Sequence, residues 1–381
     1  MPHRPKSLEV RVFESFAEIE PSWSSLETHG NPTLSATWLR ALEETGCVCE
    51  ERGWVPHHVG IFDGELLVAA MPAYLKFNSE GEFIFDHGIA RAAPKFGVRY
   101  FPKLLVAVPF TPATGPRILL PRGASSAIEG AARAALLTLV AELPISSVHV
   151  LFLGGDVAAR LAGQPGLLHR HSVQFHWRNR GFETFEDFLG TMPSKRRTAI
   201  RRERKELTKQ AIDIVNVRGA ELDAAAADTA YELYLTTVDK FMWGRRYLNR
   251  AFFETIFQTM PASIDLVLAK PRGAAKPIAG AFNLLSETTL YGRYWGAHRE
   301  VPFLHFNVCF YHSIERCIAE CRGTFEPGAG GEHKLARGFS PTLTHSLHAF
   351  KNSQFAALID DFFARERALL AAEVACDGTG D

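Results

Sequence analysis

A glycine-rich segment followed by charged residues stands near the C-terminus, in FEPGAGGEHKLARGFSP. Glycines let a backbone approach another group closely, because they carry no Cβ. Glu332 or His333 could then act as a general base, with Lys334 as a catalytic partner and Arg337 as an anion-binding residue. The alternative is a glycine turn capped by solvated charges. The segment matches neither a GxGxxG fingerprint nor a P-loop, so these two modes of nucleotide binding are not expected.

The segment YGRYWGA combines aromatic residues with an arginine. Strand alternation predicts Tyr291, Arg293 and Trp295 on one face and residues 292, 294 and 296 on the other. Aromatic rings beside a guanidinium can line a pocket for a carboxylate or a planar group. The alternative is core packing with one arginine reaching toward solvent.

A second group of residues that could do chemistry is His305, Cys309 and His312, at i, i+4 and i+7 in VPFLHFNVCFYHSIERC. This spacing on one helix face could hold a metal ion. The surrounding phenylalanines indicate a buried core instead, and no acidic or cysteine pair stands nearby. We therefore predict no metal site, and His305 is a candidate pocket residue.

A polar loop in the first half of the chain lies within FPKLLVAVPFTPATGPR. Its candidate substrate-binding residues are Lys103, Thr111, Thr114 and Arg117. Prolines stiffen the loop, and a rigid polar loop is typical of a binding surface. The alternative is a purely structural crossover.

A strongly basic helix is predicted in MPSKRRTAIRRERKELTKQ. Arg197, Arg201, Arg204 and Lys205 recur at helical spacing, so they share a face on which like charges repel. A phosphate-bearing partner such as tRNA would relieve that repulsion, and guanidinium groups bind phosphate in a fork. The alternative is a solvated face with acidic partners. A membrane surface is less favoured, because few large apolar residues lie opposite the charges.

The elements that must position these residues follow from periodicity and turn signals. Two strands joined at Asp63-Gly64 precede a long irregular region, an alanine-rich helix and an apolar strand, SSVHVLFLG. The second half repeats this order of strand, helices, antiparallel strands, helix and strand. The expected domains are residues 1–165 and 166–381, because glycine, proline and polar residues cluster between 155 and 171. Expected strands are 8–14, IDIVNVRG, IDLVLAK, PIAGAFNLL, TTLYGRYWGA and TLTHSLHAF, and expected helices are 33–45, 126–143, 183–210, 220–240, 249–259 and 353–374.

Bulk composition excludes several classes of protein. Lysine plus arginine number 42, as do aspartate plus glutamate, so net charge gives no argument for a nucleic-acid or membrane partner. The N-terminus lacks a secretory pattern, and no run approaches the roughly 20 apolar residues of a membrane span. Six irregularly spaced cysteines favour reduced thiols and a cytoplasmic location. The chain contains no GxSxG, HExxH or CxxC pattern, so hydrolase and zinc-enzyme functions have no motif support.

Several of these segments together resemble the bacterial FemAB-like family, which is associated with peptidoglycan biosynthesis or recognition and placed in the GNAT acyltransferase superfamily. They are FPKLLVAVPFTPATGPR, RRTAIRRERK, YGRYWG, PFLHFNVCFY and GAGGEHKLARGF. The resemblance runs from about residue 31 to 370. It implies an α/β (α+β) fold of two tandem GNAT-like domains, whose mixed, mostly antiparallel sheets are flanked by helices.

The resemblance also implies transfer of an acyl or aminoacyl group to an amine, without a tightly bound cofactor. Fem-type relatives use aminoacyl-tRNA as donor, whereas ordinary GNAT enzymes such as N-acetyltransferases use acyl-CoA. The loop after YGRYWGA is HREVPFLHF, which lacks the glycines of a CoA pyrophosphate loop, and the basic helix suits tRNA phosphates. Gly88, Ile89 and Pro94 depart from the family pattern, which puts the shape of a first-domain acceptor pocket in doubt.

The leading hypothesis is therefore an aminoacyl- or acyltransferase that forms an amide on a small-molecule amine or a cell-wall precursor. The reaction is expected to proceed without a covalent enzyme intermediate. Two other functions stay open: an acyl-CoA-dependent N-acyltransferase acting on a small metabolite, and a GNAT-like binding protein without catalysis. The sequence does not define the oligomeric state.

Overall fold

The computed structural model describes residues 8–161, 165–240 and 246–378, with only the backbone described for residues 332 and 372–378. The chain divides into two compact units, Met1–Val173 with Leu343–Asp381 and Gln174–Thr342. It passes from the first unit into the second within strand β8 (Leu168–Arg178) and returns within β14 (Ser340–Phe350).

The first unit contains a small antiparallel sheet and a larger mixed one. The small sheet has the order β1 (Leu8–Phe13), β3 (His58–Asp63), β4 (Leu66–Met71). The larger sheet has the order β2 (Trp54–Pro56), β5 (Ala73–Lys76), β6 (Lys103–Val106), β7 (Ser147–Leu153), β14, β8. Strands β6 and β7 are parallel, whereas β2–β5, β5–β6 and β7–β14 are antiparallel. Every residue of β7 is buried, as its unbroken apolar run predicts.

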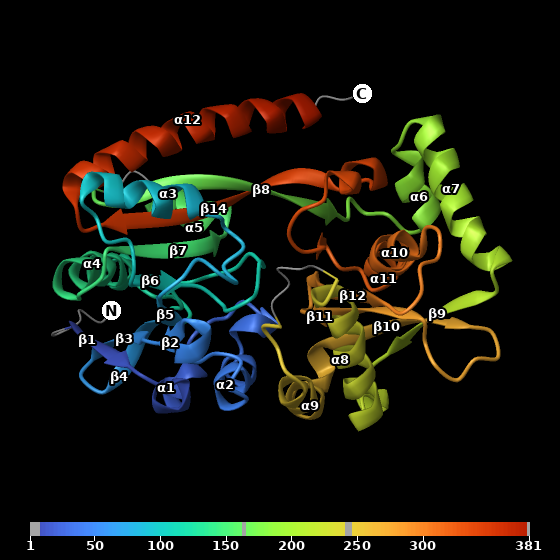
Figure 1. Ribbon diagram of the computed structural model, residues 1–381, viewed down its shortest axis with the longest axis horizontal. Coiled ribbons are helices and arrows are strands. Elements are labelled where there is room, and N and C mark those ends of the chain that lie inside the picture. Colours follow the sequence, from blue (N-terminus) through green and yellow to red (C-terminus); the bar gives the residue numbers. More distant parts are fainter. Residues whose placement is uncertain (1–7, 162–164, 241–245, 379–381) are drawn as a thin grey trace. The chain divides into compact units, whose positions relative to one another are not determined.

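Helices cover these sheets and surround the core of the first unit (Figure 1). The helix α4 packs on β4 and β7, where its alanine and leucine side chains join the valines and isoleucines of the strands. The helices are α1 (Phe16–Trp23), α2 (Ala36–Glu44), α3 (His87–Ala92), α4 (Ser126–Glu142), α5 (Gly155–Leu161) and α12 (Ser353–Gly378), with short 3₁₀ turns η1 (Pro32–Leu34), η2 (Glu50–Arg52) and η3 (Ala93–Phe96).

The C-terminal helix α12 belongs to the first unit. Phe355, Ile359 and Phe363 recur at four-residue spacing and are buried in one cluster with Ile89 of α3, and the partly buried Phe350 of β14 packs against this cluster. Because β14 also pairs with β7, residues from 343 onward are grouped with the first unit. This differs from the expected division at 165/166, which placed the C-terminal strand and helix in the second domain. Sequence order alone does not reveal that the chain returns to its first unit.

The second unit is built on one sheet with helices on both faces. Its strand order is β8, β13 (Thr324–Glu326), β12 (Thr289–Ala297), β11 (Ala279–Leu285), β10 (Ile264–Pro271), β9 (Ile212–Val217). Only β12–β13 is parallel among the pairs described in this unit. Its helices are α6 (Phe185–Gly190), α7 (Ser194–Lys209), α8 (Ala224–Val238), α9 (Arg250–Thr259), α10 (Leu304–Phe306) and α11 (His312–Ala319), with a π-helical turn η6 (Asn307–Tyr311) and 3₁₀ turns η4 (Gly219–Glu221), η5 (Pro261–Ser263) and η7 (Glu332–Arg337).

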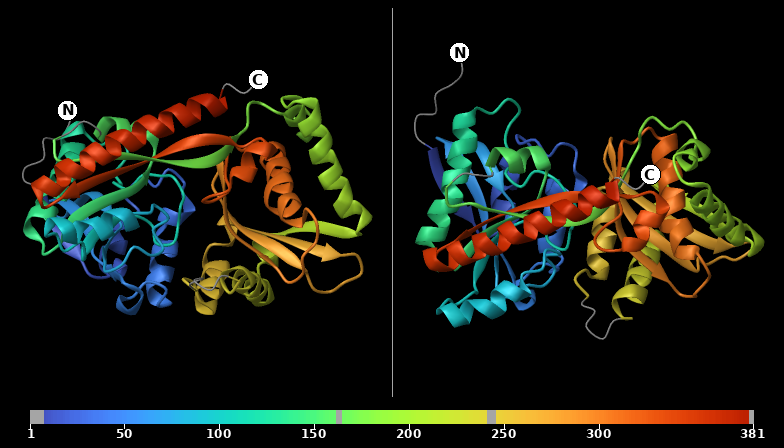
Figure 2. Two further views of the ribbon diagram at one scale, coloured as in Figure 1. Left: turned by 45° about the horizontal axis from the view of Figure 1, so that its top comes forward. Right: turned by 90° about the horizontal axis from the view of Figure 1, so that it is seen from above.

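Helices α8 and α9 lie on one face of this sheet, and α7, η6 and α11 lie on the other (Figure 2). Two glycines allow α8 to pack closely. A Cβ on Gly296 would lie 1.9 Å from the carbonyl oxygen of Leu233, and one on Gly280 would lie 2.8 Å from the side chain of that leucine.

The fold class expected from the sequence is confirmed: α/β, with mixed, mostly antiparallel sheets flanked by helices. The expected strands and helices are present within a few residues of their predicted bounds, except that the helix expected at 183–210 is divided into α6 and α7, with Pro193 preceding α7. The Asp63-Gly64 turn joins β3 to β4.

Across the described residues, the helices are too short or too polar for any of them to span a lipid bilayer.

Candidate functional site

A pocket of about 200 Å³ opens on the face of the second unit's sheet that α8 does not cover. It is bounded by β11, β12, the α10–η6 segment, the loop after β13 and η7. Its lining residues are Ala281, Asn283, Gly292, Arg293, Tyr294, Trp295, His305, Cys309, Phe310, Phe325, Pro327, Ala329, Gly330, Gly331, His333 and Lys334. Five of the candidate site residues named from the sequence thus meet here: Arg293, Trp295, His305, His333 and Lys334.

A β-bulge shapes the strand that forms the floor of this pocket. The register between β11 and β12 shifts at Phe282/Asn283, so that Gly292 pairs with Asn283 and Tyr294 pairs with Phe282. Arg293 is the extra residue between these two pairs. A bulge redirects the side chain that it carries, and bulges are common beside active sites. Here the bulge carries Arg293, a residue of the pocket lining whose Nη2 donates to the Tyr294 hydroxyl at 3.4 Å.

The bulge also changes which residues share a face. Ala281, Asn283 and Trp295 lie on the pocket face, whereas Tyr291 lies on the opposite face. The prediction that Tyr291, Arg293 and Trp295 share one face is therefore wrong. One inserted residue reverses the alternation between Tyr291 and Trp295. Tyr291 is buried and does not line the pocket.

The glycine loop after β13 wraps around Lys334. Gly328, Gly330 and Gly331 have positive φ angles of 84°, 70° and 93°, which favour glycine. Lys334 Nζ donates to the carbonyl oxygen of Gly328 at 2.8 Å and to that of Ala329 at 3.4 Å. The glycine loop thus binds the Lys334 amine through two of its own carbonyl oxygens.

Lys334 carries a charge with little solvent around it. The residue is only 4% exposed, and in the described part of the structure it forms no ion pair. Burial lowers the pKa of Lys334 to about 8. The amine is therefore mostly protonated at neutral pH, and an ammonium in such an environment attracts a developing negative charge strongly. The side chain of Glu332, the other expected catalytic residue, lies outside the described part of the chain.

Two imidazoles stand beside this amine. The His305 ring lies 5.1 Å from Trp295 and 6.0 Å from His333, centroid to centroid. Burial, followed by the charges of His333, Lys334 and Arg337, lowers the pKa of His305 to about 4, so it is neutral at pH 7. His333 is more exposed, and burial also lowers its pKa. A neutral imidazole can accept a proton.

The helix that follows His305 contains a π-helical turn, which separates the three residues that share a face in a regular α-helix. His305 and Cys309 line the pocket, but His312 Nε2 contacts Asn216 Oδ1 at 2.6 Å. Burial raises the pKa of the Cys309 thiol well above its usual range. A reactive thiolate is thus not favoured at this position.

Arg337 serves the structure of η7. Its Nη2 lies 3.2 Å from both carboxylate oxygens of Glu203 on α7, and Nη1 donates to the carbonyl oxygen of His333 at 2.9 Å. Its guanidinium also stacks 3.2 Å from the Phe306 ring centroid, and Tyr311 donates to Glu203. The pocket lining does not include Arg337. Its geometry thus favours a structural role, in which a buried ion pair anchors η7. The predicted role of Arg337 in substrate binding is less favoured.

The basic side chain Lys103 lies in the first unit, in a compact ionic cluster. Its Nζ donates to Glu82 Oε2 at 2.7 Å and to Asp86, which also accepts from Tyr100 at 2.6 Å. Burial raises the pKa of Glu82 to about 7. Burial also acts to raise the pKa of Asp86, but the Lys103 ammonium outweighs it and holds that pKa below its usual range. The charge of Lys103 is already balanced within the core.

The polar loop after Lys103 packs inside the first unit. Arg117 has no exposed surface, and its guanidinium donates to the carbonyl oxygens of Ala113 at 2.5 Å and Pro116 at 3.0 Å. The Thr111 hydroxyl donates to Pro109 O at 2.8 Å, and the carbonyl of Thr114 accepts from Asn31. These contacts favour the structural crossover over the predicted substrate-binding loop.

Of the four α7 residues predicted to bind phosphate, Arg201 and Lys205 are exposed and Arg197 and Arg204 are partly buried. Arg201 pairs with Glu186 at 2.6 Å and Arg204 pairs with Glu315 at 2.8 Å. Arg197 donates to Met192 O at 2.7 Å. Lys205 is exposed, together with Lys195 and Arg202 at a spacing of seven and three residues. The exposed basic residues Arg196, Arg201 and Lys209 have partners in Leu335 O, Glu186 and Glu206. Among the described residues, Lys195, Arg202 and Lys205 have none, and these three form the solvated basic face.

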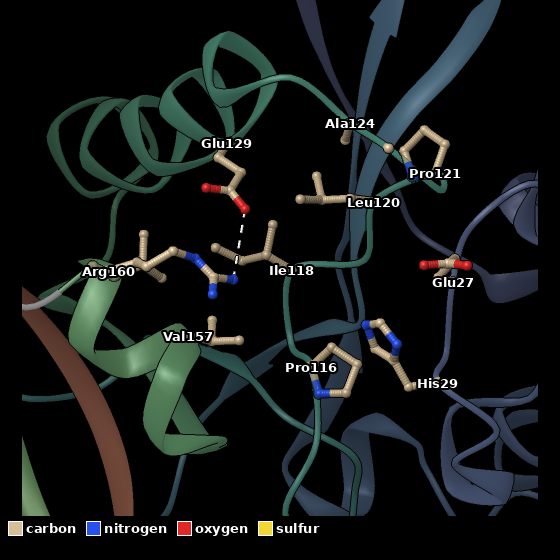
Figure 3. A pocket seen from close by; sticks show the side chains of 12 residues that line it. Glu27, His29, Pro116, Ile118, Leu120, Pro121, Ala124, Glu129, Val157 and Arg160 are labelled. Carbon is tan, nitrogen blue, oxygen red and sulfur yellow. Dashed lines mark ion pairs between the residues drawn. The ribbon is translucent and has the colours of Figure 1, made fainter.

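The first unit has a pocket of its own, of about 250 Å³, between α4, α5 and the segment 116–124 (Figure 3). A dashed line in Figure 3 marks the ion pair between Arg160 and Glu129, two residues of the lining. Their nitrogen and oxygen atoms are 3.6 Å apart. Arg160 is half exposed, and Glu27 pairs with the exposed Arg122. These charges are solvated and paired, so this pocket offers less for catalysis than the pocket around Lys334.

Some polar residues in and near these sites were not predicted. Asn283 lines the pocket and is 2% exposed; its amide donates to Asp265 at 3.2 Å. In the first unit, His149 and His348 lie within 2.5 Å of each other between their Nδ1 atoms. A sequence signal for such residues exists: each is a lone polar residue in an otherwise apolar strand, as His149 is in SSVHVLFLG and Asn283 is in AFNLL.

Solved structures show the same fold. A structure titled FemX is 10% identical in sequence, covers 92% of this chain and 100% of its own, and superposes with a TM-score of 0.54. The C-terminal domain of a putative lysylphosphatidylglycerol synthetase from Agrobacterium fabrum is 11% identical, with coverages of 91% and 97% and a TM-score of 0.50. No curated protein matches the sequence significantly.

A sequence profile of the FemAB-like family, described as peptidoglycan biosynthesis/recognition, matches residues 15–377. This match spans both units and every segment that carried the resemblance. The chain belongs to the FemAB-like family.

Proposed function

We propose that this chain is an acyl- or aminoacyltransferase that forms an amide on an amine acceptor, with its reaction centre in the pocket around Lys334. The single observation that carries the proposal is a buried, charged amine in a pocket, with no carboxylate partner among the described residues. Membership of the FemAB-like family supports the class of reaction.

Amide formation requires stabilisation of a developing negative charge and removal of a proton from the amine, and residues of this pocket can supply both. When an amine attacks an ester or thioester carbonyl, negative charge develops on the carbonyl oxygen. Lys334 Nζ has three donors, and two of them point to Gly328 and Ala329, so the third can reach that oxygen. The guanidinium of Arg293 at the bulge provides a second cation for the acyl donor or for a carboxylate of the acceptor.

The attacking amine must also lose a proton. His333 is our candidate general base, because its imidazole lines the pocket and burial lowers its pKa, which keeps it neutral at physiological pH. Glu332 stays a second candidate from the sequence. Cys309 is the one thiol among the described residues of the lining, and its raised pKa disfavours a covalent acyl-enzyme. Direct transfer from donor to acceptor is therefore the favoured path.

The donor that we favour is aminoacyl-tRNA, with acyl-CoA as the alternative. The solvated basic face of α7 supports a long polyanion. The loop between β12 and α10 has no glycine, which is unlike a pyrophosphate-binding loop. The name of the Agrobacterium fabrum protein describes a lysyl-bearing product, and the family description supports a cell-wall precursor as acceptor. A bacterial cytoplasmic enzyme fits both co-substrates.

The proposal is tested by measuring label transfer from bulk charged tRNA and from acetyl-CoA to an extract of soluble peptidoglycan precursors. In parallel, tRNA binding is measured at two salt concentrations for the wild type and for two triple variants. One variant neutralises the α7 face through Lys195→Gln, Arg202→Gln and Lys205→Gln. Its matched control neutralises three exposed cations elsewhere in the second unit through Arg180→Gln, Lys276→Gln and Arg299→Gln.

We expect transfer from charged tRNA, and weaker tRNA binding by the α7 variant only. The slope of log affinity against log salt concentration should decrease in magnitude by about 2 to 3 in this variant, because up to three phosphate contacts are lost. Transfer from acetyl-CoA alone would replace the proposed donor. Saturable binding of precursor without transfer from either donor would contradict an enzymatic function and favour a binding protein.

A further inference from the structure

Three histidines from distant parts of the sequence meet in the first unit, away from both pockets. His169 and His171 lie two residues apart on β8, and His345 lies on the neighbouring strand β14. Alternation places His169 and His171 on the same face of the sheet. Each imidazole offers one nitrogen, and these three nitrogens all lie within 4.8 Å of one another.

The distances among these rings fit metal coordination. His169 Nε2 lies 3.1 Å from His345 Nδ1. Two nitrogens bound tetrahedrally to zinc at 2.0–2.1 Å would be about 3.3 Å apart. The ring centroids of His171 lie 4.6 Å from His169 and 4.9 Å from His345. Only small side-chain movements are needed to turn the three nitrogens toward one ion.

An unsatisfied atom points to a ligand at this position. His171 Nδ1 is buried and has no hydrogen-bond partner among the described residues. A buried nitrogen of this kind loses free energy unless something binds it. Imidazole is also the ligand type that suits zinc and related divalent ions. Near His345, Gly155 has no side chain; a Cβ there would lie 3.3 Å from His345 Nε2.

The charges that face the cluster come from α12. Arg367 donates to the carbonyl oxygen of His169, and Glu366 lies beside the cluster while it pairs with Arg170 at 2.7 and 2.9 Å. Burial lowers the pKa of His169 to about 4 and lowers those of His171 and His345. All three imidazoles are thus neutral at pH 7, and neutral imidazole is the form that binds metals.

We propose that His169, His171 and His345 form a binding site for one divalent transition-metal ion, with zinc as the best match and a fourth position left for water. The ion would cross-link β8 and β14 close to where the chain leaves and re-enters the first unit. This site is independent of the proposed transfer reaction. It was not predicted from the sequence, because His345 follows His171 only after 173 intervening residues.

The test is titration of the chelator-treated full chain with Zn²⁺ by calorimetry, and with Co²⁺ by its visible absorption. We expect one ion per chain, a tetrahedral Co²⁺ spectrum and a higher Tm with Zn²⁺. Loss of a hydrogen bond that supports a metal ligand lowers metal affinity about 10- to 100-fold. His171→Asn and His345→Asn each remove a ligand, so each should lower the Zn²⁺ affinity by more than this. The matched control is His298→Asn, because His298 is exposed and lies in the second unit.

Circular dichroism and Tm without metal show whether the variants keep the fold. The conservative His171→Gln provides a second variant if His171→Asn unfolds. No binding at one ion per chain would overturn the proposal, as would unchanged affinity in His171→Asn and His345→Asn. Loss of binding in His298→Asn would place the ion elsewhere.

Discussion

Two of the buried lysines, Lys103 in the first unit and Lys334 in the second, are placed in contrasting surroundings. Lys103 is 1% exposed and donates to two carboxylates, Glu82 and Asp86. Lys334 is 4% exposed and donates to two backbone carbonyls. The pKa of Lys334 falls to about 8, because no carboxylate among the described residues compensates its burial. Lys334 lines a pocket, whereas Lys103 does not line any pocket described here.

The difference separates a structural cation from a functional one. A buried charge is stable when opposite charges and hydrogen bonds surround it, as around Lys103. A desolvated cation without such a partner interacts strongly with any anion that enters its pocket. Burial alone therefore does not identify a catalytic lysine. The partners of the amine and its position in a pocket are both needed, because the buried Lys76 also donates to Asn78 and the Glu80 carbonyl but lines none of these pockets.

The largest effect is expected on stability from Lys103→Met. The variant leaves Glu82 and Asp86 buried without their cation, which should lower the free energy of unfolding by about 3–5 kcal/mol at pH 7. The deficit should shrink at pH 5, because a carboxylate that has lost its cation has a raised pKa and is neutralised there. Urea unfolding at both pH values measures this.

Lys95→Met is the matched control for that experiment, because Lys95 is an exposed lysine of the same unit. If Lys103→Met were as stable as this control, the ionic cluster would not carry the structural role that we assign to it.

The next effect is on catalysis, from Lys334→Ala. Loss of a donor to the developing oxyanion should reduce kcat by about 10²–10³-fold. The fold should persist, because removal of an uncompensated charge does not leave a buried carboxylate behind. Steady-state transfer rates and Tm are measured on the same preparation. A variant that keeps its full rate and its Tm would place Lys334 outside the reaction.

A smaller effect concerns the pH dependence of stability. The pKa of Lys334 is lowered to about 8 in the folded chain from 10.5, so between these values only the unfolded chain holds the extra proton. Stability of the wild type relative to Lys334→Met should thus rise with pH, by about 2 kcal/mol from pH 7.5 to 9.5. Urea unfolding of both proteins at these pH values checks it. A constant difference would mean that the amine is solvated.

Most of the fold could be predicted from the sequence, because it depends on local patterns. The apolar run of β7, the Asp63-Gly64 turn and the spacing in α4 each specify their own element. The return of β14 and α12 to the first unit could not be predicted, because it depends on strand pairing across the chain.

The candidate site was predicted in part for the same physical reason. The cluster His333–Lys334 and the pocket role of His305 follow from residue types near one another in sequence. The bulge at Arg293 depends on pairing with β11, so alternation alone placed Tyr291 on the wrong face. Arg337 pairs with Glu203, which is distant in sequence. Lys103 pairs with Glu82, which lies in an irregular segment. Neither partner could be identified from local patterns.

The same limit applies to α7. Helical spacing correctly groups residues by face, but it does not say which face meets acidic neighbours. Glu186 of α6 forms an ion pair with Arg201, and Glu315 of α11 forms one with Arg204. The exposed set of Lys195, Arg202 and Lys205 became clear only in the folded unit.

The most direct test of the central claim is the pH profile of kcat/KM for the wild type and for Lys334→Arg. If Lys334 acts as a cation, wild-type activity should decline above an apparent pKa of about 8. Lys334→Arg stays charged over this range, so its lower activity should show no such decline. A wild-type rate that rises through pH 8, or a decline that persists unchanged in Lys334→Arg, would contradict a cationic role for this amine.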